Sequence, residues 1–563
     1  MSESAGPVVM TAAGGQPYHR RSARNMLIIL TGMALMVTYV ETMVLPAFNN
    51  FVQFFQYPPD STVVWILSAY LLVGVVATPV FGKLGDIYGK KKMLLVAMAV
   101  YAVAVSVAGF TPNIGAAFGV SLPDRIYFLI GARAFQGIGM GMFPLAYAMI
   151  PEFFPAKEVG RAQGVISAMF AGGAVVGLVL GGWIAQDFGW QLTYHTVIPF
   201  AVALLILAFY ILRESPTRTG ESIDIPGITS LGLALTMLML GITETAYWPF
   251  LSFTGGRIGS LTWGVPEFML LALVLFAFFA GWELRARFPV IRLRSLKARN
   301  ILVSNINGVI AGLTMFLVFT GLVILLELPY LPGSSVTGFS QSELWMGLLA
   351  LPSAGAMLAF GMPLGRMTSR YGPKPIMILG FGLMVMGGIL LTQYANPAFQ
   401  IGLVSTLSPS TPPFIPQPVP LLLIIAPMLV LVGTVANMIA MSNVIVLSVE
   451  PAELGVQTGM NQTFRNLGSA IGPVLVSSII ASFVIGSIYA GPRVGYLPIY
   501  SVAAFQWVFA VLAAISVVGL IASIFLRNYK FAADGTRSGA PAAEGLATGP
   551  YPRVILPEET EPR

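Results

Sequence analysis

Glu41 lies within the apolar run 25–46, NMLIILTGMALMVTYVETMVLP, and is the only charged residue between Arg24 and Asp60. If this run crosses a membrane, a charge in its middle costs at least about 2.5–3.5 kcal/mol, so it is seldom kept without a partner or a use. A carboxyl group in such a place can take up and release a proton. The alternative is an acid at the outer end of the run that reaches interfacial water.

Arg133 is the candidate partner of Glu41, because it lies inside another apolar run, 126–149. At about 1.5 Å per residue, Arg133 is roughly 11 Å and Glu41 roughly 8–13 Å from the outer ends of their helices. The two groups can therefore share a level. We predict that Glu41 and Arg133 form a proton-coupling site, with Glu327 as a second and weaker candidate.

Arg465 is the other basic residue inside an apolar run, 457–488. Charges buried in membranes usually face a cavity or a partner. Asn461 and Gln462 precede it and can offer hydrogen bonds to a small molecule. We expect these three residues to line a central substrate cavity; the alternative is an arginine that reaches the inner interface.

The inner loop 82–92, GKLGDIYGKKK, combines closely spaced glycines with opposite charges. Glycines let helices approach each other closely, and a carboxylate beside basic groups can form a latch that is broken on switching. We predict an inner gate, whereas a loop retained only for its positive charge is the alternative. The gate residues are Gly82, Lys83, Gly85, Asp86, Gly89 and Lys90, with Arg366 and Arg370 in a second copy.

Composition identifies the class of protein. The 563 residues are 56% hydrophobic and only 9% charged, whereas soluble domains carry about 25% charged residues. The net charge of +7 comes from basic residues in short loops between apolar runs, which membrane topology explains better than nucleic-acid binding. The chain has no cysteine, and its two histidines, His19 and His195, form no metal-ligand cluster. We find no phosphate-binding loop and no catalytic constellation, so we expect no cofactor, no metal and no enzyme.

Apolar runs long enough to cross about 30 Å of hydrocarbon predict fourteen membrane spans. They fall near 25–46, 61–81, 92–110, 126–149, 162–186, 194–212, 226–246, 264–282, 301–328, 343–364, 375–394, 420–447, 457–488 and 501–526. With the N-terminus inside, inner segments hold 25 of the 30 Lys and Arg residues and outer segments hold three. This bias predicts that both termini are cytoplasmic.

An internal repeat relates the two halves of the chain. At an offset of 283, Gly82, Tyr88 and Gly89 meet Gly365, Tyr371 and Gly372; at an offset of 295, Gly173 meets Gly468. The matched spans are shifted by eight, an even number, so the repeats are parallel and suggest a secondary transporter with a site between its halves. The expected divisions are an N-tail (1–24), a six-helix half (25–212), a linker with two extra helices (213–298), a second six-helix half (299–526) and a disordered C-tail (527–563).

Four motifs resemble the major facilitator superfamily, and specifically its fourteen-span drug:proton antiporter branch. GKLGDIYGKKK is similar to the family's signature loop, RAFQGIGMG (133–141) to its span-4 signature, GAVVGLVLGG (173–182) to its antiporter signature, and IDIPG (223–227) to the start of span 7. Leu178 stands where the antiporter signature has proline, whereas the repeat copy has Pro473. Val37 stands where the branch has its span-1 acid, one turn before Glu41.

The resemblance implies an all-α membrane protein of the major facilitator type, which exports amphipathic drugs in exchange for protons by alternating access. The small residues of span 5 form a stripe whose close packing is expected to close the outer route, and ordinary tight helix packing is the alternative. The packing residues are Gly173, Gly177, Gly181, Gly182, Gly468, Gly472 and Pro473. Expected partners are a small-molecule substrate, protons and lipids, with the chain a monomer in the cell membrane. The alternatives are an exporter or facilitator of a lipid or sugar, or a transport-dead sensor.

Overall fold

The computed structural model describes most of the chain apart from its termini and several connecting segments. The described residues are 20–56, 61–154, 156–215, 222–244, 257–258, 261–262, 264–328, 338–394, 402–403, 419–449, 454–489, 496–527, 530–531 and 537–538. The N-tail before residue 20, most of the Pro-rich outer segment 396–419 and nearly all of the C-tail predicted to be disordered lie outside these residues.

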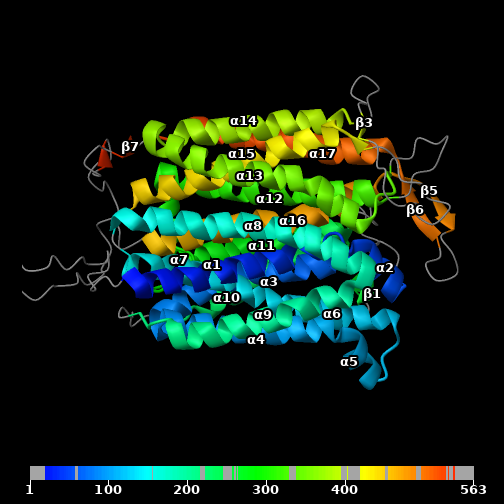
Figure 1. Ribbon diagram of the computed structural model, residues 1–563, viewed down its shortest axis with the longest axis horizontal. Helices are drawn as coiled ribbons and strands as arrows, with labels where there is room; N and C mark the ends of the chain where they lie inside the picture. The colour runs from blue at the N-terminus through cyan, green and yellow to red at the C-terminus, as the bar shows by residue number, and fades with distance from the viewer. Residues whose placement is uncertain are drawn as a thin grey trace, which may run out of the picture.

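Long helices run side by side along one axis (Figure 1). The first half contains α1 (Arg20–Thr42), α2 (Phe48–Phe55), α3 (Ser61–Tyr88), α4 (Lys90–Gly109), α5 (Thr111–Ala117), α6 (Ile126–Gly137), α7 (Met142–Phe153), α8 (Ala156–Phe188) and α9 (Trp190–Ile211). Then come α10 (Ile225–Glu244), α11 (Val265–Glu283), α12 (Arg299–Glu327), α13 (Glu343–Tyr371), α14 (Pro373–Thr392), α15 (Leu422–Ser448), α16 (Leu454–Ala481) and α17 (Val502–Ile524). Three short 3₁₀ helices are η1 (Pro123–Arg125), η2 (Ile138–Gly141) and η3 (Leu293–Lys297).

Thirteen helices in the described part of the chain are long and apolar enough to cross a membrane. Each corresponds to one of the fourteen predicted spans. The remaining prediction, 162–186, falls on α8, whose apolar stretch in the described residues is the shorter Gly172–Phe188. The chain is therefore a multi-pass membrane protein, as its composition predicted.

The short strands lie beyond the helix ends. They pair as four antiparallel hairpins: β1 (Arg257–Ile258) with β2 (Leu261–Thr262), β3 (Gly402–Leu403) with β4 (Val419–Pro420), β5 (Val484–Tyr489) with β6 (Tyr496–Tyr500), and β7 (Lys530–Phe531) with β8 (Arg537–Ser538). Figure 1 shows β7 at the left end of the bundle and α2, β5 and β6 at the right end. The left end is the one predicted to be inner, and the right end is the one predicted to be outer.

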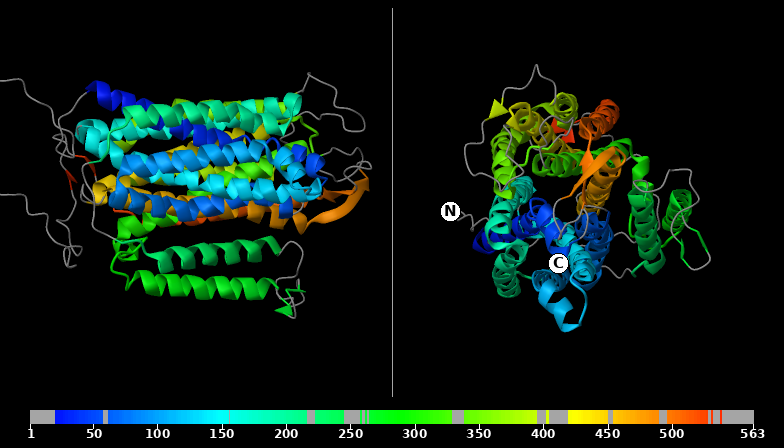
Figure 2. Two further views of the ribbon diagram at one scale, coloured as in Figure 1. Left: turned by 90° about the horizontal axis from the view of Figure 1, so that it is seen from below. Right: turned by 90° about the vertical axis from the view of Figure 1, so that its right-hand side faces the viewer.

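The two halves pack against each other along the seams α8–α13 and α3–α16. Helices α10 and α11 pair with each other and stand outside the two halves, as the end-on view in Figure 2 shows. Helix α10 contacts both α3 and α16, one from each half. The predicted linker helices are thus positioned against a seam between the halves.

The repeat is visible in the backbone. Gly89, between α3 and α4, has φ +106°, and its repeat equivalent Gly372, between α13 and α14, has φ +88°. Residues with a side chain rarely adopt these values, so glycine ends the helix at both places. In each half the first long helix also packs on the fifth, α1 on α8 and α12 on α16.

Candidate functional site

Glu41 lies near the outer end of α1 and is buried, with 4% of its surface exposed. Its Oε2 atom is buried without a hydrogen-bond partner among the described residues. Two arginines act on it electrostatically: Arg465 of α16 has the larger effect and Arg133 of α6 the smaller. The carboxyl group is therefore enclosed and faces positive charge from both halves of the protein.

Arg133 is fully buried, but its guanidinium is held by other groups than Glu41. Its Nε donates to the carbonyl of Ile66 at 3.0 Å, and its Nη1 donates to Oε1 of Gln136 at 2.7 Å. The guanidinium also stacks over the ring of Tyr70, 4.4 Å from its centre. Its Nη2 is buried without a hydrogen-bond partner in the described part of the chain. The predicted partnership with Glu41 is thus an interaction at a distance and not an ion pair.

Arg465, predicted from the sequence to line a substrate cavity, is also an electrostatic partner of Glu41, a pairing that the sequence did not predict. It is 7% exposed, its guanidinium lies 4.7 Å from the centre of the Phe170 ring on α8, and its Nη1 contacts the sulfur of Met438 on α15 at 3.5 Å. Phe170 belongs to the opposite half. Arg465 therefore lies where the two halves meet.

Asn461 and Gln462, predicted to line a cavity with Arg465, make contacts within their own half. Asn461 donates to the carbonyl of Ser304 on α12 at 3.0 Å, and Gln462 donates to Asn466 one turn later at 3.1 Å. Asn461 thus ties α16 to α12. Asn466, which the sequence reading passed over, donates to the hydroxyl of Thr78 on α3 at 3.2 Å and so bridges the halves.

We call Glu41, Arg133, Arg465, Tyr70 and Gln136 the central charged cluster. Tyr70 and Gln136 were missed by sequence reasoning, although Gln136 lies one turn after Arg133 and so shares its helix face. Glu327 is not part of this cluster. Its electrostatic neighbour is another acid, Glu343.

The inner loop forms a network of ion pairs that includes an unpredicted acid. Lys90 is buried and lies 2.7 Å from Glu152 of α7 and 3.4 Å from Asp86. Ser215 donates to the same Glu152 at 2.8 Å. Lys83 donates to the carbonyls of Phe288 and Pro289, in the segment that follows the linker helices. The loop therefore connects α3, α4 and α7 to the linker.

Gly89 is required for a second reason besides its backbone angle. Glu214 accepts hydrogen bonds from the backbone amides of Lys91 at 3.0 Å and Lys92 at 3.1 Å, at the beginning of α4. A Cβ atom on Gly89 would lie 2.7 Å from that carboxyl group. Glu214 is thus the acid at the N-terminus of α4, where a negative charge is electrostatically favoured.

The second copy of the loop does not join this network. Arg370 stacks on its neighbour Tyr371 at 5.4 Å. Within the described residues, neither Arg366 nor Arg370 forms a hydrogen bond or ion pair with the residues of the first copy. This difference between the two copies of the loop follows from the sequence, because the second copy has no acidic residue in its loop.

The glycines of α8 face other helices closely. Gly173 abuts the α1 backbone at Leu35, Gly177 abuts α1 at Tyr39 and Thr42, and Gly181 abuts Met43 directly after the helix. Gly182 instead abuts the Glu343 carbonyl on α13, in the opposite half. In α16, Gly468 and Gly472 pack on α12, and Pro473 lies inside the helix. Helix α8 therefore uses glycines at a spacing of four to pack within its own half and the adjacent Gly182, on another face, to pack across the outer seam.

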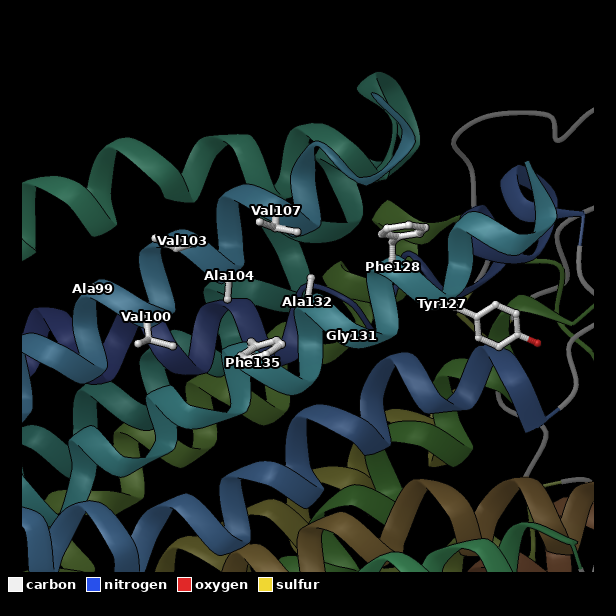
Figure 3. Close-up of a pocket in the computed structure, with 10 residues that line it drawn as sticks. All are labelled: Ala99, Val100, Val103, Ala104, Val107, Tyr127, Phe128, Gly131, Ala132 and Phe135. Atoms are coloured by element: carbon white, nitrogen blue, oxygen red, sulfur yellow. The ribbon is translucent and has the colours of Figure 1, made fainter. Parts of the chain in front are cut away.

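An apolar groove of about 800 Å³ lies on α4 and α6 (Figure 3). Val103, Tyr127 and Phe135 in its lining are more than half exposed. This is the kind of surface that a membrane helix presents to lipid. The groove holds none of the residues of the central charged cluster.

Comparisons with known proteins agree on one family. A model described as Major Facilitator Superfamily matches residues 27–473 and, in a second match, 310–551. The Multidrug transporter protein MdtP of Bacillus subtilis is 24% identical over 421 residues, 75% of this chain and 69% of that protein. The Tetracenomycin C resistance and export protein of Streptomyces glaucescens is 26% identical over 478 residues, 83% of this chain and 79% of that protein.

The fold has solved counterparts as well. The human organic anion transporter MFSD10 superposes with a TM-score of 0.54 at 15% identity, covering 89% of this chain and 99% of that one. At this identity the match shows the fold alone. The chain spans about two thirds of the length of the first curated relatives it matches.

Proposed function

Because the chain belongs to the major facilitator superfamily, whose members are transporters and not enzymes, we propose that this secondary transporter exports amphipathic compounds in exchange for protons. The observation that carries the proposal is Glu41, a buried carboxyl group acted on by arginines from both halves. A rocking motion of one half against the other changes the distance between Glu41 and Arg465, and with it the relative stability of the carboxylate and the carboxylic acid.

In the proposed cycle, Glu41 takes up a proton when the site faces outward and releases it when the site faces inward. The deprotonated site offers the Glu41 carboxylate and Arg465 to a substrate that enters from the inside, and protonation from the outside removes the carboxylate charge and so weakens substrate binding. Arg133 stays fixed by Ile66 and Gln136 and holds a constant positive charge near the site. The proton and the substrate thus compete for one region of charge.

The substrate class rests on chemistry and on relatives. Arg465 is flanked by Phe170 and Met438, a combination that suits molecules with both an apolar surface and polar groups. Relatives named for multidrug transport and for tetracenomycin C export are consistent with such substrates. We further propose that the inner loop is the inner gate and that the two halves move as separate six-helix bodies joined by α10 and α11.

The test uses inside-out vesicles with an imposed pH gradient and a panel of amphipathic dyes. We expect Glu41→Gln to lower proton-driven uptake at least about tenfold, and Arg465→Leu to change the apparent affinity for individual dyes. Asp124→Asn is the matched control, because Asp124 is an exposed acid on the outer side. Wild-type pH dependence in Glu41→Gln would refute the coupling role.

The same vesicles separate the remaining alternatives. Transport of a sugar or lipid with none of the dyes would favour an exporter or facilitator of a defined metabolite. Proper membrane insertion without transport of any compound would favour a sensor. Either result would overturn the proposed substrate class.

A further inference from the structure

Residues from both halves meet at the outer ends of α2, α8 and α13. The side-chain nitrogen of Asn50 on α2 donates to Oε2 of Glu343 at 2.8 Å and to the carbonyl of Ala185 at 3.0 Å. Gln186 of α8 accepts from the backbone amide of Leu344 at 3.2 Å. Glu343 begins α13 in the second half, whereas Asn50 and Gln186 belong to the first. These contacts join the two halves at the outer side of the protein.

Glu327, at the end of α12, lies beside this contact without polar partners. It is 7% exposed, and both of its carboxyl oxygens are buried without a hydrogen-bond partner among the described residues. Among the described residues, the charged group that acts on it is Glu343. The neighbouring elements offer neutral Asn50 from α2, neutral Gln186 from α8 and exposed Asp187 beside it. We call Glu327 and Glu343 the outer carboxyl pair.

Two neighbouring carboxylates without a cation cannot both remain charged in a dry contact, since repulsion and lost hydration act in the same direction. The closed outer side is compatible with a pair that carries at least one proton. Full deprotonation requires water, and a separation of α13 from α2 and α8 would bring water to the pair. Proton binding and closure are therefore linked.

We propose that the outer carboxyl pair is a proton-binding site, separate from Glu41, whose occupancy holds the outer ends of the two halves together. Protonated, the pair keeps the Asn50–Glu343 contact closed. Deprotonated, it favours the outward-open arrangement. The proposal deepens the proton-coupled transport proposed above and rests on it for its biological use. Its test, however, measures a conformational equilibrium that exists without any transported compound.

The absence of cysteine makes the experiment direct, because introduced cysteines are the only labelling sites. Phe118→Cys, at the outer end of the first half, and Leu421→Cys, at the start of α15 in the second half, replace exposed residues. Spin labels on the full chain in lipid nanodiscs report the outer distance by pulsed electron resonance between pH 5 and 9. One linked proton changes the ratio of open to closed molecules by up to tenfold per pH unit.

We expect the wild-type outer distance to lengthen with rising pH. Glu327→Gln and Glu343→Gln should remain closed at every pH, because glutamine keeps the shape and has no charge. Asp187→Asn is the control and should keep the wild-type response. Wild-type pH dependence in both glutamine variants would overturn the proposal, and so would a response that follows Na⁺ concentration and not pH.

Two further measurements keep the result interpretable. Infrared difference spectra between pH 5 and 9 should contain a protonated-carboxyl band that Glu327→Gln removes; an unchanged band overturns the assignment even if a variant distorts the contact. Glu41→Gln should keep the outer response while losing proton-driven transport. If Glu41→Gln instead removes the outer response, the pH sensor is Glu41 and the outer carboxyl pair is not a separate site.

Discussion

Gly182 allows the sharpest test of how the outer side closes. A Cβ atom at this position would lie 3.0 Å from the carbonyl carbon of Glu343 and 3.4 Å from the nitrogen of Leu344, with the Glu343 oxygen closer still. Helices α8 and α13 would have to separate by about 1 Å to restore ordinary contact distances. Gly182→Ala should therefore open the outer seam between the two halves.

The expected magnitude follows from the cost of overpacking. A methyl group inserted into a tight contact costs about 1–3 kcal/mol. If that cost is avoided in the outward-open arrangement, the ratio of open to closed molecules rises roughly 5- to 150-fold. Spin labels at Phe118→Cys and Leu421→Cys should show a larger population at long distance.

Two other glycines of α8 serve as matched controls. Gly172→Ala meets no heavy atom within 4 Å and should change nothing. Gly181→Ala would place its methyl group 2.7 Å from Cα of Met43, within the same half. It should lower thermal stability without lengthening the distance between the halves. The reasoning is refuted if Gly182→Ala gives the same distance distribution as Gly172→Ala.

The remaining predictions concern the inner network and the supposed cavity. Lys90→Met leaves Glu152 buried without its 2.7 Å partner, so we expect a loss of about 3–5 kcal/mol of stability, measured as a lower melting temperature in detergent. The control Lys92→Met changes an exposed lysine and should have little effect. Equal melting temperatures of the two variants would contradict the role of the network. Asn461→Ala removes its hydrogen bond to Ser304 and should cost about 0.6–1.7 kcal/mol in the same assay while leaving the range of transported dyes unchanged. If Asn461→Ala instead changes the range of transported dyes, as expected for Arg465→Leu, the prediction that Asn461 lines the substrate cavity would be supported.

The positions of the membrane-spanning helices were largely predictable from the sequence, because each span must satisfy its own backbone hydrogen bonds and stay apolar over about 30 Å. These are local requirements that composition records. Thirteen of the fourteen predicted spans fall on helices of suitable length and composition in the described residues. The repeat was readable for a similar reason. The backbone at Gly89 and Gly372 demands glycine whatever surrounds it, so the two copies keep the same residue at the same point of each half.

Which charges meet was decided only by the tertiary structure. Glu41 and Arg133 were predicted as partners from their depths, but depth along a helix does not specify the direction in which a side chain points. The packing of the halves brings Arg465, 424 positions away in the chain, to act more strongly on Glu41. The same packing pairs Lys90 with Glu152 and Asn50 with Glu343. No sequence motif distinguishes either of these two acids.

The glycines of α8 show what the sequence predicts about packing and what it leaves to the tertiary structure. The sequence of α8 predicts that its glycine-rich face packs closely, since small residues permit close helix contact. It does not say against what. Gly181 and Gly182 are adjacent in the chain, and a helix turns about 100° per residue, so the first meets Met43 directly after α1 and the second meets α13. The seam between the halves thus depends on a rotation that only the assembled helices fix.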